Sequence, residues 1–181
     1  MKVSVSSVIT AVFFLVFACI PVHGGELGVG KPAPDFTLSY ATKDTIVANG
    51  FTLSSQIGRS ILLLAFYPAD WSGGCTKEMC TLRDEFNDLA TLGITVFGIS
   101  GDYVYAHREW ARQLNLPFAL LSDPKHEVAA LYQSYNEQTG YNKRTVFVID
   151  KQGKIAYMDL QYSVATPDSF NKLKAALARM K

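Results

Sequence analysis

Two cysteines, Cys75 and Cys80, are the residues of this sequence whose type and spacing best suit chemistry. They follow a continuous apolar run, Ile61–Phe66, which predicts a strand buried on both faces. The chain then turns through Gly73 and Gly74, and we expect a helix to begin at Cys75. The carboxyl ends of strands are where α/β proteins bind their ligands. We therefore predict a reactive site at Cys75.

A cysteine in the first turn of a helix is favoured as the thiolate. The helix dipole and the unpaired backbone N–H groups stabilise negative charge there, so we expect the pKa of Cys75 to lie below the free value of about 8.5. A decrease to about 6 would ionise roughly 90% of the thiol at pH 7 and corresponds to about 3.4 kcal/mol. A helix dipole alone supplies less than this. A neighbouring cation is therefore expected.

Cys80 follows Cys75 by five residues, in the same expected helix. Five residues advance about 7.5 Å along a helix axis and rotate by roughly 140°, whereas a disulfide needs Cα atoms within about 6.8 Å of each other. An intact helix therefore cannot join the two sulfurs. Either the first turns unwind when the bond forms, or Cys80 is a buried apolar cysteine. The spacing alone leaves both interpretations open.

The pattern Pro68-x-x-x-Ser72-x-x-Cys75 resembles the active-site motif of the peroxiredoxins. The helical Cys-x-x-x-x-Cys pair is similar to the bacterioferritin-comigratory protein and peroxiredoxin Q subfamily. The resemblance covers nearly all of the chain after the first residues. Further segments that match the family in order are Gly30–Phe36, Gly74–Thr76, Leu82–Glu85, Gly98–Ser100, Leu120–Asp123 and Arg144–Asp150.

The resemblance implies a role for each residue of the motif. The implied catalytic residues are Cys75, Cys80, Arg144, Ser72 and Pro68, with Glu78 and Gly74 in support. Cys75 would attack the peroxide, and Cys80 would be the resolving cysteine. Arg144 would be the expected cation, oriented by Glu78. The Ser72 hydroxyl and the Cys75 N–H would bind the peroxide oxygens, and Pro68 would shield the thiolate.

Two residues of the loop, Trp71 and Gly73, depart from the pattern that is common in this subfamily. A proline is usual at position 73, so its absence bears on the rigidity of the loop. Neither departure affects the chemistry of the cysteine.

The resemblance implies a thiol-dependent peroxidase that reduces hydrogen peroxide and organic hydroperoxides. Cys75 would become a sulfenic acid, Cys80 would convert it to an intramolecular disulfide, and a thioredoxin-like or other thiol reductant would restore both thiols. No cofactor or metal is expected, because the histidines have no ligand-like spacing. The resemblance also implies a monomer.

Two other functions on a related fold fit the sequence less well. An exported thioredoxin-type thiol–disulfide oxidoreductase normally has Cys-x-x-Cys and a proline directly before the strand that faces it, and residues 142–145 lack that proline. A copper-delivery protein would need a Cys-x-x-x-Cys pair and a later histidine, but no histidine follows His126. The peroxidase is the better interpretation.

The elements that must position this chemistry predict one α/β domain. Besides Ile61–Phe66, we expect strands at Ile94–Ile99, Phe118–Leu121, Val146–Ile149 and Ile155–Leu160. Apolar stripes predict helices at Met79/Leu82/Phe86/Leu89, Ala106/Trp110/Leu114, Val128/Leu131/Tyr135 and, after Pro167, Phe170/Leu173/Ala176/Leu177. An N-terminal β-hairpin, with strands at Asp35–Ser39 and Thr45–Ala48, would lie against this body. This order predicts a mixed central sheet flanked by helices, and the resemblance implies the thioredoxin-like fold.

The first residues read as a targeting segment. Lys2 precedes an apolar run, Val8–Ile20, and small residues follow, as in a secretory signal peptide. We expect residues 1–24 to be removed, leaving a domain of residues 25–181 that is exported to the periplasm or secreted. The sequence before Cys19 resembles a lipobox, so lipidation of Cys19 is the alternative and would tether the protein to a membrane.

Composition excludes several other classes of protein. The 181 residues are 49% apolar and 18% charged, which is enough apolar material for one buried core. The net charge is +1, without the positive excess that nucleic-acid binding requires.

Overall fold

A seven-stranded mixed sheet forms the centre of the computed structural model, which describes residues 27–180. The predicted signal peptide and Cys19 lie outside these residues. The sheet order is β2-β1-β5-β4-β3-β8-β9. Its strands are β1 Thr37–Ala41, β2 Ile46–Thr52, β3 Ile61–Phe66, β4 Ile94–Ser100, β5 Ala119–Ser122, β8 Thr145–Ile149 and β9 Ile155–Asp159, and a separate hairpin pairs β6 Tyr135–Asn136 with β7 Tyr141–Asn142.

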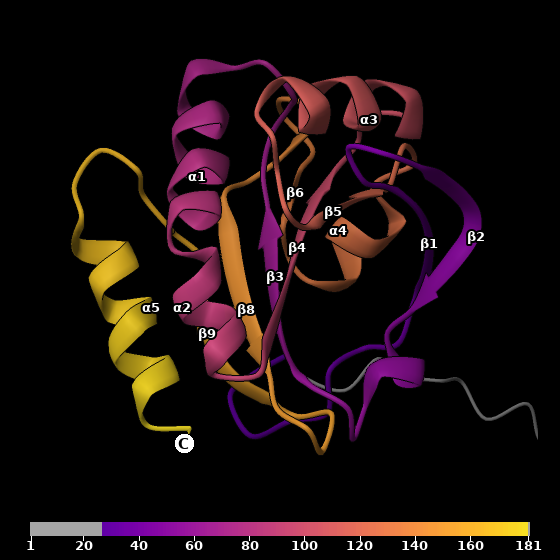
Figure 1. The fold of residues 1–181 in the computed structure, drawn as a ribbon. Coiled ribbons are helices and arrows are strands. Elements are labelled where there is room, and N and C mark those ends of the chain that lie inside the picture. The colour runs from indigo at the N-terminus through magenta and orange to yellow at the C-terminus, as the bar shows by residue number, and fades with distance from the viewer. Residues whose placement is uncertain (1–26, 181) are drawn as a thin grey trace, which may run out of the picture.

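Helices cover both faces of this sheet (Figure 1). They are α1 Gly73–Asp84, α2 Phe86–Thr91, α3 Val104–Gln113, α4 Glu127–Leu131 and α5 Asp168–Ala178, with a short 3-10 helix at Ser54–Gln56. The core on one face joins β3 side chains to α1, α2, α3 and α5. The core on the other face joins β3 to α4 and to the N-terminal segment. The mixed α/β sheet flanked by helices is confirmed.

The central strand β3 is buried on both faces, as its apolar run predicts. It pairs in parallel with β4 and antiparallel with β8, so that Phe66 lies opposite both Ile99 and Thr145. Alternate β3 side chains therefore enter the two cores. This position inside the sheet, between β4 and β8, fixes the end of β3, from which the predicted reactive loop departs.

The N-terminal hairpin differs from the prediction in the bounds of its strands and in its place in the sheet. Strands β1 and β2 pair antiparallel as expected, but β1 also pairs with β5, residue Tyr40 opposite Leu121. The hairpin is therefore an edge of the central sheet and does not lie against it. Pairing with β5 satisfies backbone groups that a separate hairpin would leave to water.

Two of the predicted helical stripes are wrong in detail. In α3 the buried residues are His107, Trp110 and Ala111. Of the predicted stripe, Trp110 is buried, whereas Leu114 packs only partly against the core and Ala106 is half-buried. The stripe after Val128 ends early, because Leu131 is 49% exposed and Tyr135 lies in β6. Hydrophobicity alone missed His107 on the buried face of α3, because it gave no weight to a histidine that has buried hydrogen-bond partners.

The other predicted elements are confirmed. The predicted stripe Met79/Leu82/Phe86/Leu89 is divided between α1 and α2, and all four of its residues pack into the same core. The last helix, α5, follows Pro167 and buries Leu173 and Leu177. Among residues 27–180, none of the helices has the length and apolarity needed to span a membrane.

Candidate active site

Cys75 lies in the first turn of α1, as predicted, although the helix begins two residues earlier, at Gly73. Ser72 is the N-cap residue, and its hydroxyl accepts a hydrogen bond from the backbone N–H of Cys75 at 3.4 Å. Serine at this position satisfies one of the N–H groups that a helix leaves unpaired. The Cys75 side chain is fully buried. The sequence thus places the sulfur at the positive end of a helix, out of contact with water.

Arg144 is the cation that the sequence predicts beside this sulfur. Its Nη2 donates to Sγ of Cys75 at 3.4 Å. Arg144 stands directly before β8, and alternation along the strand places it on the same face as Val146 and Val148, which pack into the core beneath α1. Because β8 pairs with β3, the guanidinium reaches the helix that follows β3.

Glu78 completes this group from the next turn of α1. Its Oε2 accepts a hydrogen bond from Nη1 of Arg144. Its Oε1 is the one buried side-chain nitrogen or oxygen atom of residues 27–180 without a hydrogen-bond partner. Burial raises the pKa of Glu78 to about 7, and Arg144 opposes this only in part. Burial would lower the pKa of Arg144, but the charges of Glu78 and Cys75 outweigh it, and the pKa is raised. The structure thus pairs Glu78 with Arg144, and the role of Glu78 in orienting Arg144 for the reaction stays a prediction.

Gly74 makes room for the guanidinium. A Cβ atom placed at position 74 would lie 3.1 Å from Nη2 of Arg144, which is closer than an ordinary contact. Glycine therefore allows the guanidinium to approach the first turn of α1. This supports the placement of Gly74 at the site.

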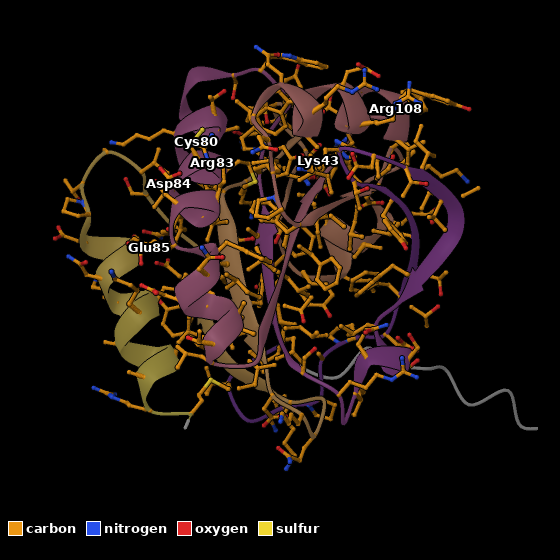
Figure 2. The ribbon with its side chains drawn as sticks, in the orientation of Figure 1. Lys43, Cys80, Arg83, Asp84, Glu85 and Arg108 are labelled. Atoms are coloured by element: carbon orange, nitrogen blue, oxygen red, sulfur yellow. The ribbon has the colours of Figure 1, made fainter. Side chains whose placement is uncertain are left out.

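Cys80 is on α1 with Cys75, but the structure does not bring the two sulfurs together. Both cysteines are free, α1 is continuous from Gly73 to Asp84, and Cys80 is half-buried. Figure 2 shows Cys80 on α1 together with Arg83 and Asp84. This arrangement agrees with the prediction that an intact helix cannot join Cys75 to Cys80. The disulfide itself stays a prediction.

The loop between β3 and α1 carries the remaining motif residues. Pro68 is half-buried in it, and its shielding of the thiolate stays a prediction. Trp71 is half-exposed, has a left-handed backbone with φ of 56°, and donates from its indole to Oε1 of Gln113 at 2.9 Å. The unusual tryptophan thus ties the loop to α3.

Sequence reasoning missed a buried cluster behind this loop. Asp70 accepts hydrogen bonds from the hydroxyl of Tyr67 and faces Nδ1 of His107, and all three side chains are buried. Two signals were available: Asp70 stands between Pro68 and Ser72 in the motif, and His107 precedes Trp110 and Ala111 by one helical turn.

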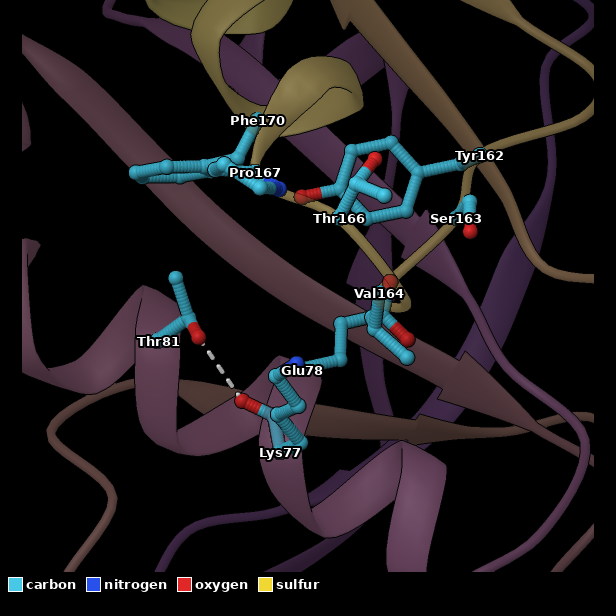
Figure 3. Close-up of a pocket in the computed structure, with 9 residues that line it drawn as sticks. All are labelled: Lys77, Glu78, Thr81, Tyr162, Ser163, Val164, Thr166, Pro167 and Phe170. Carbon is cyan, nitrogen blue, oxygen red and sulfur yellow. Dashed lines mark hydrogen bonds between the residues drawn. The ribbon is translucent and has the colours of Figure 1, made fainter.

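A pocket of about 190 Å³ opens beside Glu78 (Figure 3). Its walls come from α1, from the segment that joins β9 to α5, and from the first turn of α5. Its lining residues are Lys77, Glu78, Thr81, Tyr162, Ser163, Val164, Thr166, Pro167 and Phe170. The pKa of Tyr162 is raised by burial and by the charge of Glu78. Cys75, Ser72 and Arg144 do not line this pocket, so it is not the place of the reacting atoms. Within residues 27–180 no group of three or more His, Cys, Asp or Glu side chains is placed to hold a metal ion.

A buried cysteine at the start of a helix, with a guanidinium on its sulfur and a thioredoxin-like α/β fold around it, defines a cysteine-based peroxidase. The chain belongs to the AhpC/TSA family, whose family model matches residues 29–158. It is a peroxiredoxin, and its enzymatic class is thiol-dependent peroxidase.

Relatives of the bacterioferritin-comigratory and peroxiredoxin Q type confirm the resemblance. The chain is 38% identical over 137 residues to the putative peroxiredoxin bcp of Coxiella burnetii, covering 72% of this chain and 87% of the relative. It is 33% identical over 133 residues to peroxiredoxin Bcp of Bacillus subtilis, covering 70% and 81%. Among solved structures, peroxidoxin BcpB of Mycobacterium tuberculosis matches with a TM-score of 0.71 and 28% identity, covering 86% and 99%. The reduced 2-Cys peroxiredoxin of Plasmodium vivax, at 23% identity, TM-score 0.72 and coverage of 83% and 80%, shares the fold.

Proposed function

We propose that this peroxiredoxin reduces hydrogen peroxide and organic hydroperoxides at Cys75. The observation that carries the proposal is the hydrogen bond from Nη2 of Arg144 to the fully buried Cys75 sulfur. A positive charge at this distance favours the thiolate, which is the nucleophilic form of cysteine.

The thiolate of Cys75 attacks one oxygen of the peroxide. An S–O bond forms and the O–O bond breaks, so that Cys75 becomes a sulfenic acid, and the leaving hydroxide or alkoxide takes from solvent the proton that the thiol released when it ionised. Negative charge moves from sulfur to the leaving oxygen, within reach of the Arg144 guanidinium. The Ser72 hydroxyl accepts from the Cys75 N–H and keeps its own proton to donate. Donors that are in place before the reaction stabilise this charge without reorganisation.

Cys80 resolves the sulfenic acid in the proposed cycle. Its sulfur attacks the sulfur of Cys75, an S–S bond forms, and the hydroxyl of the sulfenic acid leaves as water. The first turns of α1 must unwind for this step, since the intact helix holds the cysteines about 7.5 Å apart along its axis. A dithiol reductant of the thioredoxin-like kind then restores both thiols by two exchange steps.

The partners and location of the enzyme belong to the same proposal. Both cysteines lie on one helix of one chain, which supports a cycle within a monomer. Export by the segment of residues 1–24, with a membrane tether if Cys19 is lipidated, rests on the sequence pattern. Membership of the AhpC/TSA family favours the peroxidase over the thioredoxin-type oxidoreductase.

The test compares the wild-type chain with Cys75→Ser and Cys80→Ser in peroxide consumption driven by dithiothreitol. Cys75→Ser should consume peroxide no faster than buffer with the reductant. Cys80→Ser should consume one equivalent rapidly in the absence of reductant, and mass spectrometry should find the added oxygen on Cys75. Consumption by Cys75→Ser at the wild-type rate would remove Cys75 from the reaction.

A further inference from the structure

Asp70 is a buried carboxylate in the loop that joins β3 to α1. Its Oδ1 accepts the hydroxyl of Tyr67 at 2.8 Å, and its Oδ2 lies 2.9 Å from Nδ1 of His107. Its backbone N–H donates to the carboxylate of Asp102 at 2.9 Å. Asp70 is therefore hydrogen-bonded to three parts of the fold: the segment after β3, helix α3 and the segment after β4.

The partners of His107 fix the number of protons in this cluster. Nε2 lies 3.2 Å from the backbone oxygen of Leu121, and a carbonyl oxygen only accepts, so Nε2 carries a proton. A second proton must lie between Nδ1 and the carboxylate of Asp70, because two acceptors at 2.9 Å would repel. The hydrogen bonds to Tyr67 and His107 thus let the Asp70 carboxyl be buried with both of its oxygens partnered.

The other groups that face the cluster complete its hydrogen bonds. Asp102, the further charged group beside it, accepts from the hydroxyl of Ser100 at 2.7 Å as well as from Asp70. The hydroxyl of Tyr67 also lies 3.5 Å from Nδ1 of His107. Every buried side-chain atom of the cluster therefore has a partner.

The loop transmits the position of Asp70 to the reacting residues. The backbone oxygen of Asp70 accepts from the N–H of Ser72 at 2.8 Å. Trp71, between them, adopts the left-handed backbone that makes this turn possible. Ser72 then caps α1 through the N–H of Cys75. One chain of hydrogen bonds thus runs from α3 to the residue that carries the sulfur.

We propose that Asp70 is a positioning residue of the peroxidase reaction, and that His107 and Tyr67 hold its carboxylate so that the Ser72 hydroxyl meets the peroxide at Cys75. The proposal rests on the proposed function. Displacement of a reacting group by about 1 Å lowers a rate by about 10²-fold. Loss of the Asp70 side chain should therefore reduce the rate of Cys75 oxidation while the fold persists.

The chain offers a conservative variant that separates geometry from charge. In Asp70→Asn, the amide oxygen can still accept from Tyr67, and the amide nitrogen can donate to an unprotonated Nδ1 of His107. Nε2 then keeps its proton for the backbone oxygen of Leu121. Asparagine therefore keeps both side-chain hydrogen bonds of position 70, to Tyr67 and to His107. Asp70→Ala removes both of them.

The experiment measures the second-order rate constant for oxidation of Cys75 by hydrogen peroxide, using rapid acid quench and mass spectrometry at 20 °C. The variants are Asp70→Ala, Asp70→Asn and Tyr67→Phe. Leu177→Ala, a core truncation in α5, is the matched control for loss of stability. A thermal melt of each variant identifies the temperature range in which it is folded.

Asp70→Ala should lower the rate constant by about 10²-fold, Tyr67→Phe should lower it less, and Asp70→Asn should stay within about threefold of wild type. Leu177→Ala should melt earlier with an unchanged rate constant. A wild-type rate for Asp70→Ala would overturn the proposal, as would an Asp70→Asn rate as low as that of Asp70→Ala. If Asp70→Ala does not fold, a wild-type rate for Tyr67→Phe or a large loss in Asp70→Asn overturns it. An inactive wild type would instead overturn the proposed function.

Discussion

Replacement of Arg144 by glutamine tests the electrostatic basis of the proposed reaction. Glutamine keeps a long side chain with hydrogen-bond donors but removes the charge that lies 3.4 Å from the Cys75 sulfur. At an effective dielectric constant of about 20, unit charges at this separation attract by about 5 kcal/mol. Glu78 shares the same guanidinium and therefore offsets part of this attraction, although burial raises the pKa of Glu78 to about 7. We therefore expect a loss of about 3–4 kcal/mol, the range found when one preorganised donor is removed from an oxyanion site.

This loss corresponds to a decrease of about 10²–10³-fold in the second-order rate constant for oxidation by hydrogen peroxide. The assay is rapid quench with mass spectrometry, together with the rate of alkylation by iodoacetamide at pH 7, which should fall as well. Arg108→Gln is the control, since Arg108 is a partly exposed arginine of α3 that pairs with Glu109. Its rate should equal that of wild type.

Arg144→Gln also leaves Glu78 buried without its partner, and the double variant with Glu78→Gln separates this effect. If the lost charge on sulfur causes the decrease, the double variant should remain as slow as Arg144→Gln. Recovery of the wild-type rate in the double variant would show that the unpaired carboxylate had caused the loss. A decrease of less than fivefold in Arg144→Gln would refute the reasoning outright.

The remaining predictions concern residues on α1. Cys80→Ser should keep the rate of the first oxidation but lose at least 90% of steady-state turnover with thioredoxin; full turnover would assign the resolving step to an external thiol. Ser72→Ala should lower the stability by about 1 kcal/mol through loss of the helix cap and slow oxidation about tenfold, whereas Ser72→Thr should preserve both; equal behaviour of the two in melts and kinetics would contradict this. Glu78→Gln tests the raised pKa. The folded state binds this proton more tightly than the unfolded chain, so the wild-type free energy of unfolding should fall by up to about 3 kcal/mol relative to Glu78→Gln as the pH rises from about 4.5 through 7. Parallel denaturation curves across that range would argue against it.

The central strands were predictable because both of their faces are buried. A run such as Ile61–Phe66 has no polar residue to interrupt it, and the structure begins and ends β3 at these same residues. The start of α1 was predictable to within two residues, because the chain must turn after the buried strand and the apolar stripe from Met79 onwards requires a helix soon after it. Arg144 could be placed because both the pKa argument and the family motif required a cation, and the geometry supplies one.

The elements that the sequence misplaced depend on polar contacts between distant segments. His107 is buried only because Asp70 and the backbone oxygen of Leu121 accept its hydrogen bonds, and these residues are far apart in the chain. Apolar periodicity therefore found Trp110 on the buried face of α3 but missed His107. Likewise, the pairing of β1 with β5 is set by the sheet as a whole, and nothing within the hairpin sequence specifies it.

The burial of β8 on both faces affects what keeps Arg144 on the face of the sheet where Cys75 lies. In a half-exposed strand, the alternation of apolar and polar residues penalises a slip of one position, because every side chain changes face. All five residues of β8 are buried, so such a slip would still leave apolar side chains in both cores. It would, however, turn Arg144 to the opposite side of the sheet from Cys75. The irregularity at Val148/Ile149 and the tight turn at Gly153, with φ of 78°, oppose such a slip, together with the hydrogen bonds of Arg144 to Glu78 and of Thr145 to Ser134. An insertion in that turn, remote from the sulfur, should thus damage catalysis more than folding.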